Sequence, residues 1–459
     1  MEMAKLDELF SRGVSTFVDP NGVFRKSVEA KARGENPNEI IIKFGVDPTR
    51  PDLHLGHAVI LRKLRAFQDI GCKIVFLVGD YTSMIGDPTG KSKVRPEVSQ
   101  AEIEVNMKTY LAQVGKILKT DPAVFSWVRN SDWFLNVTDI APSNPDASIR
   151  IGTGLGFVKA GSFLGKAKLF DDTRMQTKQL KRPVAVTVSF SNVLFTLRHL
   201  THARLIERDM FQDRLKNGGE LYMHEMLYPV LQGIDSFALA NIYGSCALEI
   251  GGTDQTFNML IGRDVMKMNK QPEQAVLSMD IIEGLDGKEK MSKSLDNYVG
   301  IADEPNDMYG KIMSIPDSII AKYFLLATYT PSNEVVEIEK NIKEGLLHPK
   351  EAKMRLAREI VAIYHGDKLA NDAEKAFSET FREGKIPEDV SEISNESKSN
   401  IIAVLVESKC VESKSEARRL VESGAVTFLE KDMKVRDVDF IPEEGTYRVG
   451  KHRFFRIKK

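Results

Sequence analysis

The order of apolar and polar residues predicts strands alternating with helices near the start of the chain. Residues 40–44 form a mostly apolar run, and residues 58–70 carry apolar side chains at helical spacing. Residues 73–80 form a second apolar run without interruption, as is typical of a parallel strand buried on both faces. A strand, a helix and a strand in this order predict a right-handed parallel crossover, with a ligand at the carboxyl ends of the strands.

The pattern elsewhere predicts mostly helices. Residues 1–38 are predicted to be helical and polar, and residues 221–240 are predicted to form one helix. Residues 183–190 have the composition of a strand. Residues from about 300 to 385 alternate apolar and charged positions at the helical period, which predicts a helical domain.

Composition describes a multidomain protein of a reducing compartment. A length of 459 residues predicts about two to four domains, and 42% hydrophobic residues suffice for a core. The mean hydropathy is -0.24. The odd set of Cys72, Cys246 and Cys410 argues against a disulfide framework and a structural zinc site. The chain shows no signal peptide and no apolar run of ~20 residues, so we expect a cytoplasmic protein without a membrane contact.

Residues 44–57 lie between the first predicted strand and helix, and they place His54, Gly56 and His57 at a helix entrance. Unpaired backbone N–H groups and the positive end of the helix dipole favour a phosphate there. Gly56 lets a planar ligand approach the backbone. A helix cap or a surface position is the alternative interpretation of each histidine, because such a tetrapeptide also arises by chance.

A second motif, residues 290–294, places Lys290 and Lys293 three positions apart after a glycine-containing turn. On a mobile loop the two ammonium groups can reach a polyphosphate and stabilise the charge that builds on a leaving pyrophosphate. A solvated run of charge is the alternative interpretation.

The sequence HLGH at 54–57, followed at this distance by KMSKS at 290–294, resembles the paired signatures of class I aminoacyl-tRNA synthetases. Residues 84–91, 228–235 and 251–255 resemble internal motifs of bacterial tyrosyl-tRNA synthetases, in the same order. With the C-terminal segment, the resemblance covers nearly the whole chain.

The resemblance implies an α/β fold with four segments. Residues 1–298 are expected to form a Rossmann-like catalytic domain with a doubly wound parallel sheet, a connective insertion at about 134–200 and the KMSKS loop at 290–294. Residues 299–387 are expected to form a helical anticodon-binding domain. Residues 388–397 are expected to be a linker, and residues 398–459 a small α+β RNA-binding domain like that of a ribosomal small-subunit protein.

The reaction implied by the resemblance attaches tyrosine to tRNA(Tyr) in two steps. ATP and tyrosine first give tyrosyl-adenylate and pyrophosphate, and the terminal ribose of the tRNA then takes the tyrosyl group. Tyr228, Gln232 and Asp235 are spaced four and three apart, so one helical face can direct all three into a pocket. Mg²⁺ is expected to arrive with ATP, with no structural metal bound by the protein, and the family forms homodimers.

The family's roles carry over onto matching positions. Transition-state contacts are implied for the phosphate-holding Thr49, His54 and His57 and for the pyrophosphate-binding Lys91, Arg95, Lys290 and Lys293. ATP contacts are implied for Gly45, Asp47, Gly56, Gly252 and Asp254. Tyrosine contacts are implied for Asp87, Tyr228 and Gln232 at the ammonium group, Asp235 at the phenol hydroxyl and Gln255 at the carboxylate.

Two features depart from the usual family pattern. Common members carry a tyrosine two residues before Gly45, whereas this chain has Lys43, as a second bacterial branch does. The phenol-side contacts beyond Asp235 are therefore open, and Lys43 can instead be a strand residue with its ammonium in solvent. Some fifty extra residues at 141–197 fall where the family carries its dimer interface, which they either enlarge or merely flank as an exposed loop.

Positive charge is concentrated at the C-terminus. Residues 398–459 hold 14 Lys and Arg against 10 Asp and Glu, a net of +4, whereas the whole chain has a formal net charge of -1. RNA contacts are expected for Lys414, Arg418, Arg419, Lys451 and Arg453, although for any one of them a solvated surface charge is an equal alternative.

Three other functions compete with tyrosine activation. A tryptophanyl-tRNA synthetase would share the fold and both signatures, but Asp235 and the C-terminal segment favour tyrosine. A simple nucleotidylyltransferase would use the HxGH motif without the KMSKS loop and two further domains. A non-catalytic RNA-binding paralogue would keep the fold, because fold alone does not determine function.

Overall fold

The computed structural model describes most of the chain in two compact units. One unit comprises residues 1–303 and 315–349, and the other comprises residues 304–314 and 350–459. The described residues are 3–49, 52–88, 100–134, 148–150, 157–159, 188, 190–206, 209–292, 295–382, 390–394, 399–408, 410–411, 413–431, 433–450 and 453–458.

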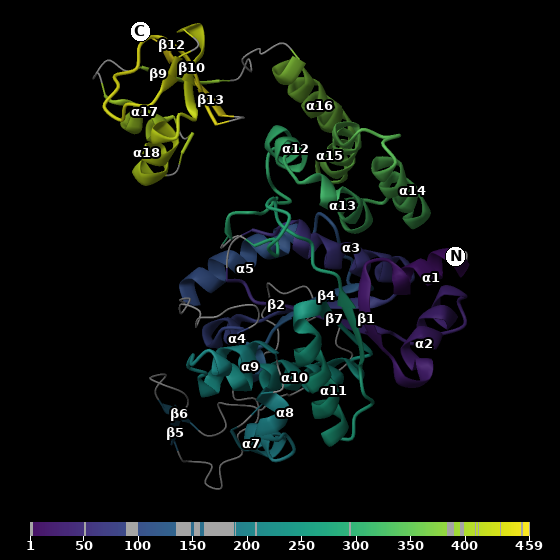
Figure 1. The fold of residues 1–459 in the computed structure, drawn as a ribbon. Coiled ribbons are helices and arrows are strands. Elements are labelled where there is room, and N and C mark those ends of the chain that lie inside the picture. The colour runs from purple at the N-terminus through teal and green to yellow at the C-terminus, as the bar shows by residue number, and fades with distance from the viewer. Residues whose placement is uncertain are drawn as a thin grey trace. The chain divides into compact units, whose positions relative to one another are not determined.

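The first unit is built around a six-stranded sheet with the strand order β1-β8-β7-β2-β3-β4 (Figure 1). All neighbouring strands pair in parallel except β1, which is antiparallel to β8 at one edge. Its strands are β1 (Val14–Val18), β2 (Ile41–Val46), β3 (Lys73–Val78), β4 (Phe125–Arg129), β7 (Leu248–Gly252) and β8 (Ala275–Met279).

The strand order changes direction between β2 and β7, which are neighbours in the sheet. The connection from β2 leads to β3 on one side, and the connection from β7 leads to β8 on the other. In sheets of this type ligands bind in the crevice at the carboxyl ends of the strands at such a point. The predicted doubly wound parallel sheet is thereby confirmed, and it directs the search for a site to the ends of β2 and β7.

Helices cover the sheet. The two long helices α10 (Met223–Tyr243) and α11 (Thr256–Met268) pack side by side, and their apolar side chains form one buried cluster with Ile41, Val75 and Leu77 of the strands. The other helices of this unit are α1 (Met3–Ser11), α2 (Val23–Ala32), α3 (Leu55–Asp69), α4 (Asp80–Ile85), α5 (Gln100–Val114), α6 (Ser131–Phe134), α7 (Phe190–Leu197), α8 (His202–Ile206), α9 (Asp209–Lys216), α13 (Ile320–Ala327) and α14 (Ser332–Lys343).

The remaining elements of the first unit are short. A hairpin of β5 (Ser148–Arg150) and β6 (Phe157–Lys159) lies in the inserted region, whose residues 160–187 are outside the described part of the chain. Of the predicted strand at 183–190, residues 183–187 and 189 lie outside the described residues, Val188 belongs to no helix or strand, and Phe190 begins α7. The 3₁₀ helices given for the described residues of this unit are η1 (Pro20–Gly22), η2 (Thr253–Gln255) and η4 (Asp317–Ile319).

The prediction that residues 1–38 are helical was wrong at β1. Gly13, with a φ of +62°, ends the first helical segment, and the next five residues pair with β8 as an edge strand. A helical pattern is ambiguous over five residues, and the pairing partner lies more than 250 residues away in the sequence. Tertiary pairing therefore overrode the local signal.

The second unit contains helices and a small sheet. The helices α12 (Pro305–Met313) and α16 (Asp367–Arg382) pack against each other, and Tyr309 and Phe377 place their ring centroids 5.3 Å apart. The helix α15 (Pro349–His365) precedes α16. The predicted helical region is thus present between residues 305 and 382.

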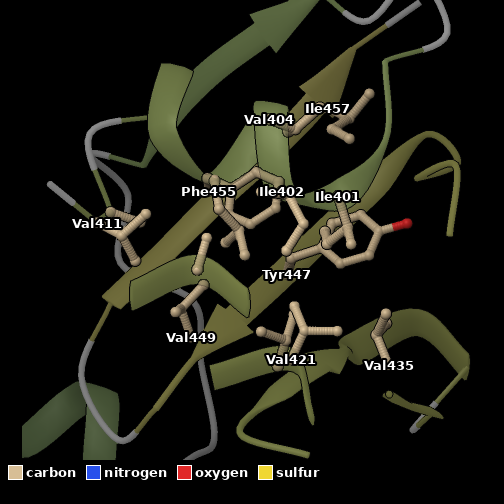
Figure 2. Packing of buried hydrophobic residues seen from close by; sticks show 14 of the residues in the cluster. Ile401, Ile402, Val404, Val411, Val421, Val435, Tyr447, Val449, Phe455 and Ile457 are labelled. Atoms are coloured by element: carbon tan, nitrogen blue, oxygen red, sulfur yellow. The ribbon is translucent and has the colours of Figure 1, made fainter. Parts of the chain in front are cut away.

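The C-terminal segment forms a five-stranded sheet in the order β11-β10-β12-β13-β9, packed with two helices. Its core is apolar, with the rings of Phe428, Tyr447 and Phe455 stacked in sequence at centroid distances of 4.6 and 5.0 Å, and Tyr447 and Phe455 are drawn in Figure 2. Its elements are β9 (Ser391–Ser394), α17 (Ile401–Glu407), α18 (Lys414–Glu422), β10 (Val426–Phe428), η5 (Leu429–Lys431), β11 (Met433–Val435), β12 (Gly445–Val449) and β13 (Arg453–Lys458).

Part of the segment expected to be a linker belongs to this sheet. Strand β9 pairs in parallel with β13, from Ser391 opposite Phe455 to Ser394 opposite Lys458. Ile393 turns into the apolar core, whereas its neighbours are exposed. The polar composition of the segment concealed a strand with a single buried side chain. No helix among the described residues is both long and apolar enough to span a membrane.

Candidate active site

A cavity of about 440 Å³ opens at the carboxyl ends of β2 and β7. The structure brings into its lining every candidate ATP, tyrosine and catalytic residue that lies in the described part of the chain. These residues are Gly45, Asp47, Thr49, His54, Gly56, His57, Asp87, Tyr228, Gln232, Asp235, Gly252, Asp254, Gln255 and Lys290. The remaining candidates, Lys91, Arg95 and Lys293, lie outside the described residues.

At the entrance of α3 two histidines cap their own helix. The Nδ1 atom of His54 accepts a hydrogen bond from the backbone N–H of Gly56 at 3.1 Å, and the Nδ1 atom of His57 accepts one from the backbone N–H of His54 at 3.3 Å. A neutral imidazole that accepts at Nδ1 carries its proton on Nε2. Capping therefore sets the tautomer of both rings and makes Nε2 a donor.

Gly56 is required by this cap. A Cβ atom at Gly56 would lie 2.9 Å from the imidazole of His54, closer than real Cβ contacts allow. A side chain at this position would displace the His54 ring from the helix entrance. The sequence suggested close approach of a ligand as the reason for glycine, and the structure adds a contact within the motif itself.

Asp235 is a buried carboxylate held by two donors, Asn130 between β4 and α6 and Trp133 on α6. The indole N–H of Trp133 donates to Oδ1 at 2.9 Å, and the amide of Asn130 donates to Oδ2 at 3.4 Å. Burial raises the pKa of Asp235 to about 7, although the Lys43 ammonium and the two hydrogen bonds act in the opposite direction. The carboxylate is therefore close to its titration point near neutral pH.

Asp47 binds two side chains from other elements. Its Oδ2 atom accepts a hydrogen bond from the Tyr228 hydroxyl at 2.8 Å, and its Oδ1 atom accepts one from the Thr82 hydroxyl at 2.8 Å. Asn130 donates to Thr82 at 3.0 Å as well as to Asp235. A continuous chain of hydrogen bonds thus connects Asp47 at the end of β2 with Asp235 on α10.

A second chain of hydrogen bonds runs between α10, α11 and Asp87. The amide of Asn258 donates to Gln232 and to Gln255 at 3.0 Å each, and Gln255 donates to Asp87 at 2.7 Å. Asn258 is fully buried beneath the two glutamines. Both glutamines and Asp87 are consequently oriented before any ligand arrives.

Lys43 is buried, so the alternative that its ammonium lies in solvent was wrong. Its side chain is 1% exposed and forms an ion pair with Glu249 of β7 at 2.9 Å. The ammonium also donates to the backbone carbonyl of Gln232 at 2.8 Å and to the Ser236 hydroxyl at 2.9 Å. Lys43 points from β2 towards α10, and a buried acid on β7 compensates its charge.

The described part of the KMSKS loop reaches the other side of the cavity. Lys290 forms an ion pair with Asp254, which lies in the short helix η2. A Cβ atom at Gly252 would lie 2.6 Å from the Asp254 carboxylate, so glycine leaves room for that carboxylate. The loop ammonium and the predicted ribose acceptor are thus partners in the absence of a ligand.

The predicted RNA contacts lie on α18 and β13. Lys414, Arg418 and Arg419 are exposed on α18, while Ala417 of the same helix is buried in the core. Arg453 reaches from β13 to Glu416 of α18 at 3.0 Å. Lys451 lies outside the described residues.

Sequence reasoning missed the residues that orient the site. Trp133, Asn130, Glu249 and Asn258 contact candidate residues from buried positions. The residue type of a buried amide or indole does not by itself indicate such a role. Its role follows from its neighbours, which come from distant parts of the chain.

Comparison with known proteins identifies the class of this fold and site. The family model described as "tRNA synthetases class I (W and Y)" matches residues 35–141 and 187–382, and the unmatched gap falls within the predicted insertion. The chain belongs to this family.

Similar proteins of known name match nearly the whole chain. A tyrosine–tRNA ligase of Moorella thermoacetica is 36% identical over 99% of this chain and 96% of its own length. One of Thermotoga maritima is 38% identical over 93% of this chain and 92% of its own length.

Solved structures agree in fold. A C-terminally truncated mitochondrial tyrosyl-tRNA synthetase of Aspergillus nidulans matches with a TM-score of 0.55 at 20% identity, over 82% of this chain and 94% of that chain. A tyrosyl-tRNA synthetase of Archaeoglobus fulgidus, complexed with L-tyrosine, matches with a TM-score of 0.53 at 18% identity, over 82% of this chain and 100% of that chain.

Proposed function

We propose that the chain activates L-tyrosine with ATP and transfers it to tRNA(Tyr) in two steps, through the cavity at the ends of β2 and β7. Tyrosine–tRNA ligase is its activity, since relatives with that name match it over nearly its full length. One observation carries the assignment of the site. A single cavity is lined by a buried acceptor, Asp235, by the helix-entrance histidines and by Lys290 of the KMSKS loop.

In the first step a carboxylate oxygen of tyrosine attacks the α-phosphorus of ATP, and the bond to the leaving pyrophosphate breaks. No protein nucleophile is needed, so the residues act by positioning and by charge stabilisation. His54 and His57 donate from Nε2 to phosphate oxygens while their Nδ1 atoms remain bound to the helix backbone. Lys290 leaves Asp254 and, with Lys293, Lys91 and Arg95, meets the pyrophosphate.

The amino acid is selected by its polar ends. Asp87, Tyr228 and Gln232 bind the ammonium group, and Gln255 faces the reacting carboxylate. Asp235 accepts a hydrogen bond from the phenol hydroxyl, and phenylalanine would leave this buried carboxylate without that donor. The hydrogen bonds of Asp87 to Gln255, and of Tyr228 to Asp47, support this arrangement because they fix the side chains in advance.

ATP is held by Gly45, Asp47, Thr49, Gly56, Gly252 and Asp254, which line the same cavity. Mg²⁺ bound to the ATP phosphates would supply positive charge that offsets part of their negative charge. The protein's carboxylates are already engaged, Asp47 with Tyr228 and Asp254 with Lys290, which supports delivery of the ion by the nucleotide. Among the described residues no group of three His, Cys, Asp or Glu side chains is placed to hold a metal.

The decisive experiment is ATP–pyrophosphate exchange with each of the twenty amino acids, without tRNA. Exchange with tyrosine alone is the expected result. Exchange with tryptophan would instead assign the chain to the sister specificity, which the fold permits, since a tryptophanyl-tRNA synthetase of Aeropyrum pernix also matches with a TM-score of 0.50. Folded protein that binds tRNA but exchanges with none would be a non-catalytic paralogue.

A homodimer is the assembly we propose. The helix α7 lies at the end of the insertion and exposes Phe190, Leu194 and Phe195, and Met223 at the start of α10 is 70% exposed. Exposed large apolar side chains such as the three on α7 are typical of an interface. Light scattering should give twice the chain mass, and a deletion of residues 142–186 should weaken the dimer. An unchanged, fully active dimer would show that the insertion is not part of the interface.

The second unit is proposed to bind the tRNA. The exposed Lys414, Arg418 and Arg419 form one basic surface on α18, and phosphate contacts are the ordinary use of such a surface. Cys72, Cys246 and Cys410 are buried and free, which supports a reducing compartment, the cytoplasm. We also place the chain in the branch of the family that carries lysine at the position of Lys43.

A further inference from the structure

The ion pair between Lys43 and Glu249 is almost completely buried. The ammonium and the carboxylate lie 2.9 Å apart, and the two side chains are 1% and 2% exposed. Both residues also line the cavity of the candidate active site. A charge pair removed from water is costly to maintain, and an apolar pair of similar volume often serves stability equally well. Its presence beside the amino-acid pocket therefore points to a role beyond packing.

The pair holds Gln232 at both ends. The Lys43 ammonium donates to the backbone carbonyl of Gln232 at 2.8 Å, and the Glu249 carboxylate accepts from the side-chain amide of Gln232 at 3.0 Å. Ser236, one turn further along α10, donates to Glu249 at 3.2 Å and accepts from Lys43 at 2.9 Å. Gln232 therefore cannot rotate away from the cavity without breaking contacts to the pair.

The pair also acts on the charge of Asp235, which lies between Gln232 and Ser236 on α10. The Lys43 ammonium favours the ionised carboxylate, whereas the Glu249 carboxylate, which acts more weakly, opposes it. Trp133 and Asn130 favour the ionised form through hydrogen bonds. Of the charged groups that act on Asp235, the Lys43 ammonium has the largest effect, and it opposes the effect of desolvation.

We propose that Lys43 and Glu249 are positioning residues for amino-acid selection: together they orient Gln232, and Lys43 favours the anionic form of the acceptor Asp235. This inference rests on the proposed roles of Gln232 at the ammonium group and Asp235 at the phenol. It gives Lys43 a role on the phenol side, which the sequence left open, and that role is exerted through Asp235.

The charge of Asp235 matters because it sets the penalty for the wrong substrate. Phenylalanine leaves Asp235 without a hydroxyl partner, and a buried anion without a partner is far less stable than a buried neutral acid. Protonated Asp235 would tolerate phenylalanine better and would bind tyrosine less selectively. The Lys43 ammonium therefore favours selectivity at neutral pH.

The test is a charge-neutral double variant, Lys43→Met with Glu249→Gln. It leaves no buried charge without a partner, and the glutamine can still accept from the Gln232 amide. The single Lys43→Met variant would leave the Glu249 carboxylate buried without this partner, so the double variant carries the test. The matched control is Lys63→Met, which removes another buried lysine of the same unit whose ammonium bonds to the backbone carbonyl of Leu9 at 2.7 Å and does not line this cavity.

The readout is pyrophosphate exchange with tyrosine and with phenylalanine at pH values of about 6 to 9, which bracket the titration of Asp235. For the double variant we expect the ratio of kcat/KM for tyrosine to kcat/KM for phenylalanine to fall by about 5-fold at pH 7. A rise of about one unit from a pKa near 7 lowers the ionised fraction of Asp235 at pH 7 from roughly one half to roughly one tenth. The pH at which the ratio is half-maximal should rise by about one pH unit, while the KM for ATP stays within about twofold.

Two outcomes would overturn the inference. A folded double variant with the wild-type ratio and pH profile would show that the pair serves only the fold, as would equal effects in Lys63→Met. The Asp235→Asn variant separates this failure from a failure of the proposed site. If Asp235→Asn also leaves the ratio unchanged, the phenol role of Asp235 is wrong. If Asp235→Asn removes the preference for tyrosine over phenylalanine and the double variant keeps it, only the role of the pair is wrong.

Discussion

Trp133 donates its indole N–H to Asp235 at 2.9 Å, although the two residues lie 102 positions apart in the sequence. Both side chains are buried, and Trp133 is fully so. The indole can only donate, so it stabilises a carboxylate and fixes the direction in which one of its oxygens points. A substrate can therefore reach Asp235 only from the side that faces the cavity.

Replacing this donor should weaken tyrosine activation. Trp133→Phe removes a hydrogen bond to a charged group, which contributes about 1.5 to 3 kcal/mol, and we expect kcat/KM for tyrosine to fall by roughly 10- to 100-fold. The KM for ATP should change little. Trp127→Phe is the matched control, because Trp127 is the second tryptophan of the chain and lies buried on β4. Equal losses in both variants would indicate a general packing effect.

The titration of Asp235 should appear in the stability of the unliganded protein. Its pKa is raised from 3.8 to about 7, so the folded state keeps a proton that the unfolded state has lost between these two values. Stability therefore falls as the pH rises from about 4 to about 7, by up to about 4 kcal/mol. Asp235→Asn removes this titration.

Urea unfolding followed by tryptophan fluorescence measures this difference, because both tryptophans lie in the first unit. Relative to the wild type, Asp235→Asn should gain stability on going from pH about 4.5 to about 8. Parallel stability curves for the two proteins across this range would contradict the prediction.

The two tasks of His54 can be separated by substitution. Asparagine is a good helix cap but cannot donate to a phosphate from the position of Nε2, so His54→Asn should fold with nearly wild-type stability and lose pyrophosphate exchange. His54→Ala should lose exchange and, in addition, about 0.5 to 2 kcal/mol of stability because the cap on α3 is gone. Urea unfolding and exchange measure the two effects. Wild-type pyrophosphate exchange by His54→Asn would show that His54 serves only as a helix cap.

Lys290 is expected to act in the transition state. Lys290→Gln removes an ammonium that meets the leaving pyrophosphate, and the rate of adenylate formation should fall by ~100- to ~1,000-fold with an unchanged KM for tyrosine. Lys288→Gln is the control, since Lys288 is exposed on the same loop and does not line the cavity. Single-turnover measurement of adenylate gives the rate directly. A rise in the KM for ATP with an unchanged rate of adenylate formation would mean that Lys290 binds ATP before the reaction.

The sequence predicted the sheet and many of the polar residues that line the cavity because these depend on local signals. Apolar runs define β2 and β3, and the spacing of Tyr228, Gln232 and Asp235 places them on one helical face whatever the rest of the chain does. The edge strand β1 depends on a partner far along the chain, so a local pattern could not show it.

The burial of Lys43 could not be predicted from the sequence either. A lysine within an apolar run is compatible with solvent or with the interior, and the choice is made by Glu249, some 200 residues later. The same holds for Trp133 and Asn258, whose polar atoms find partners only in the folded chain. Residues that contact ligands occur in motifs, whereas residues that orient them are found through contacts.

The basic surface of α18 should contribute to tRNA affinity through phosphates. Arg418→Gln combined with Arg419→Gln removes two exposed charges, while the buried Ala417 and Val421 keep the helix packed on its core. Each lost phosphate contact reduces the slope of log affinity against log salt by roughly 0.7 to 0.9, so we expect the slope to fall by about 1 to 2. Pyrophosphate exchange, which needs no tRNA, should be unchanged. Lys431→Gln is the control within the same sheet domain, because Lys431 pairs with Glu443 at 2.5 Å. An unchanged slope in the double variant, with tRNA binding intact, would show that the RNA is bound by another surface.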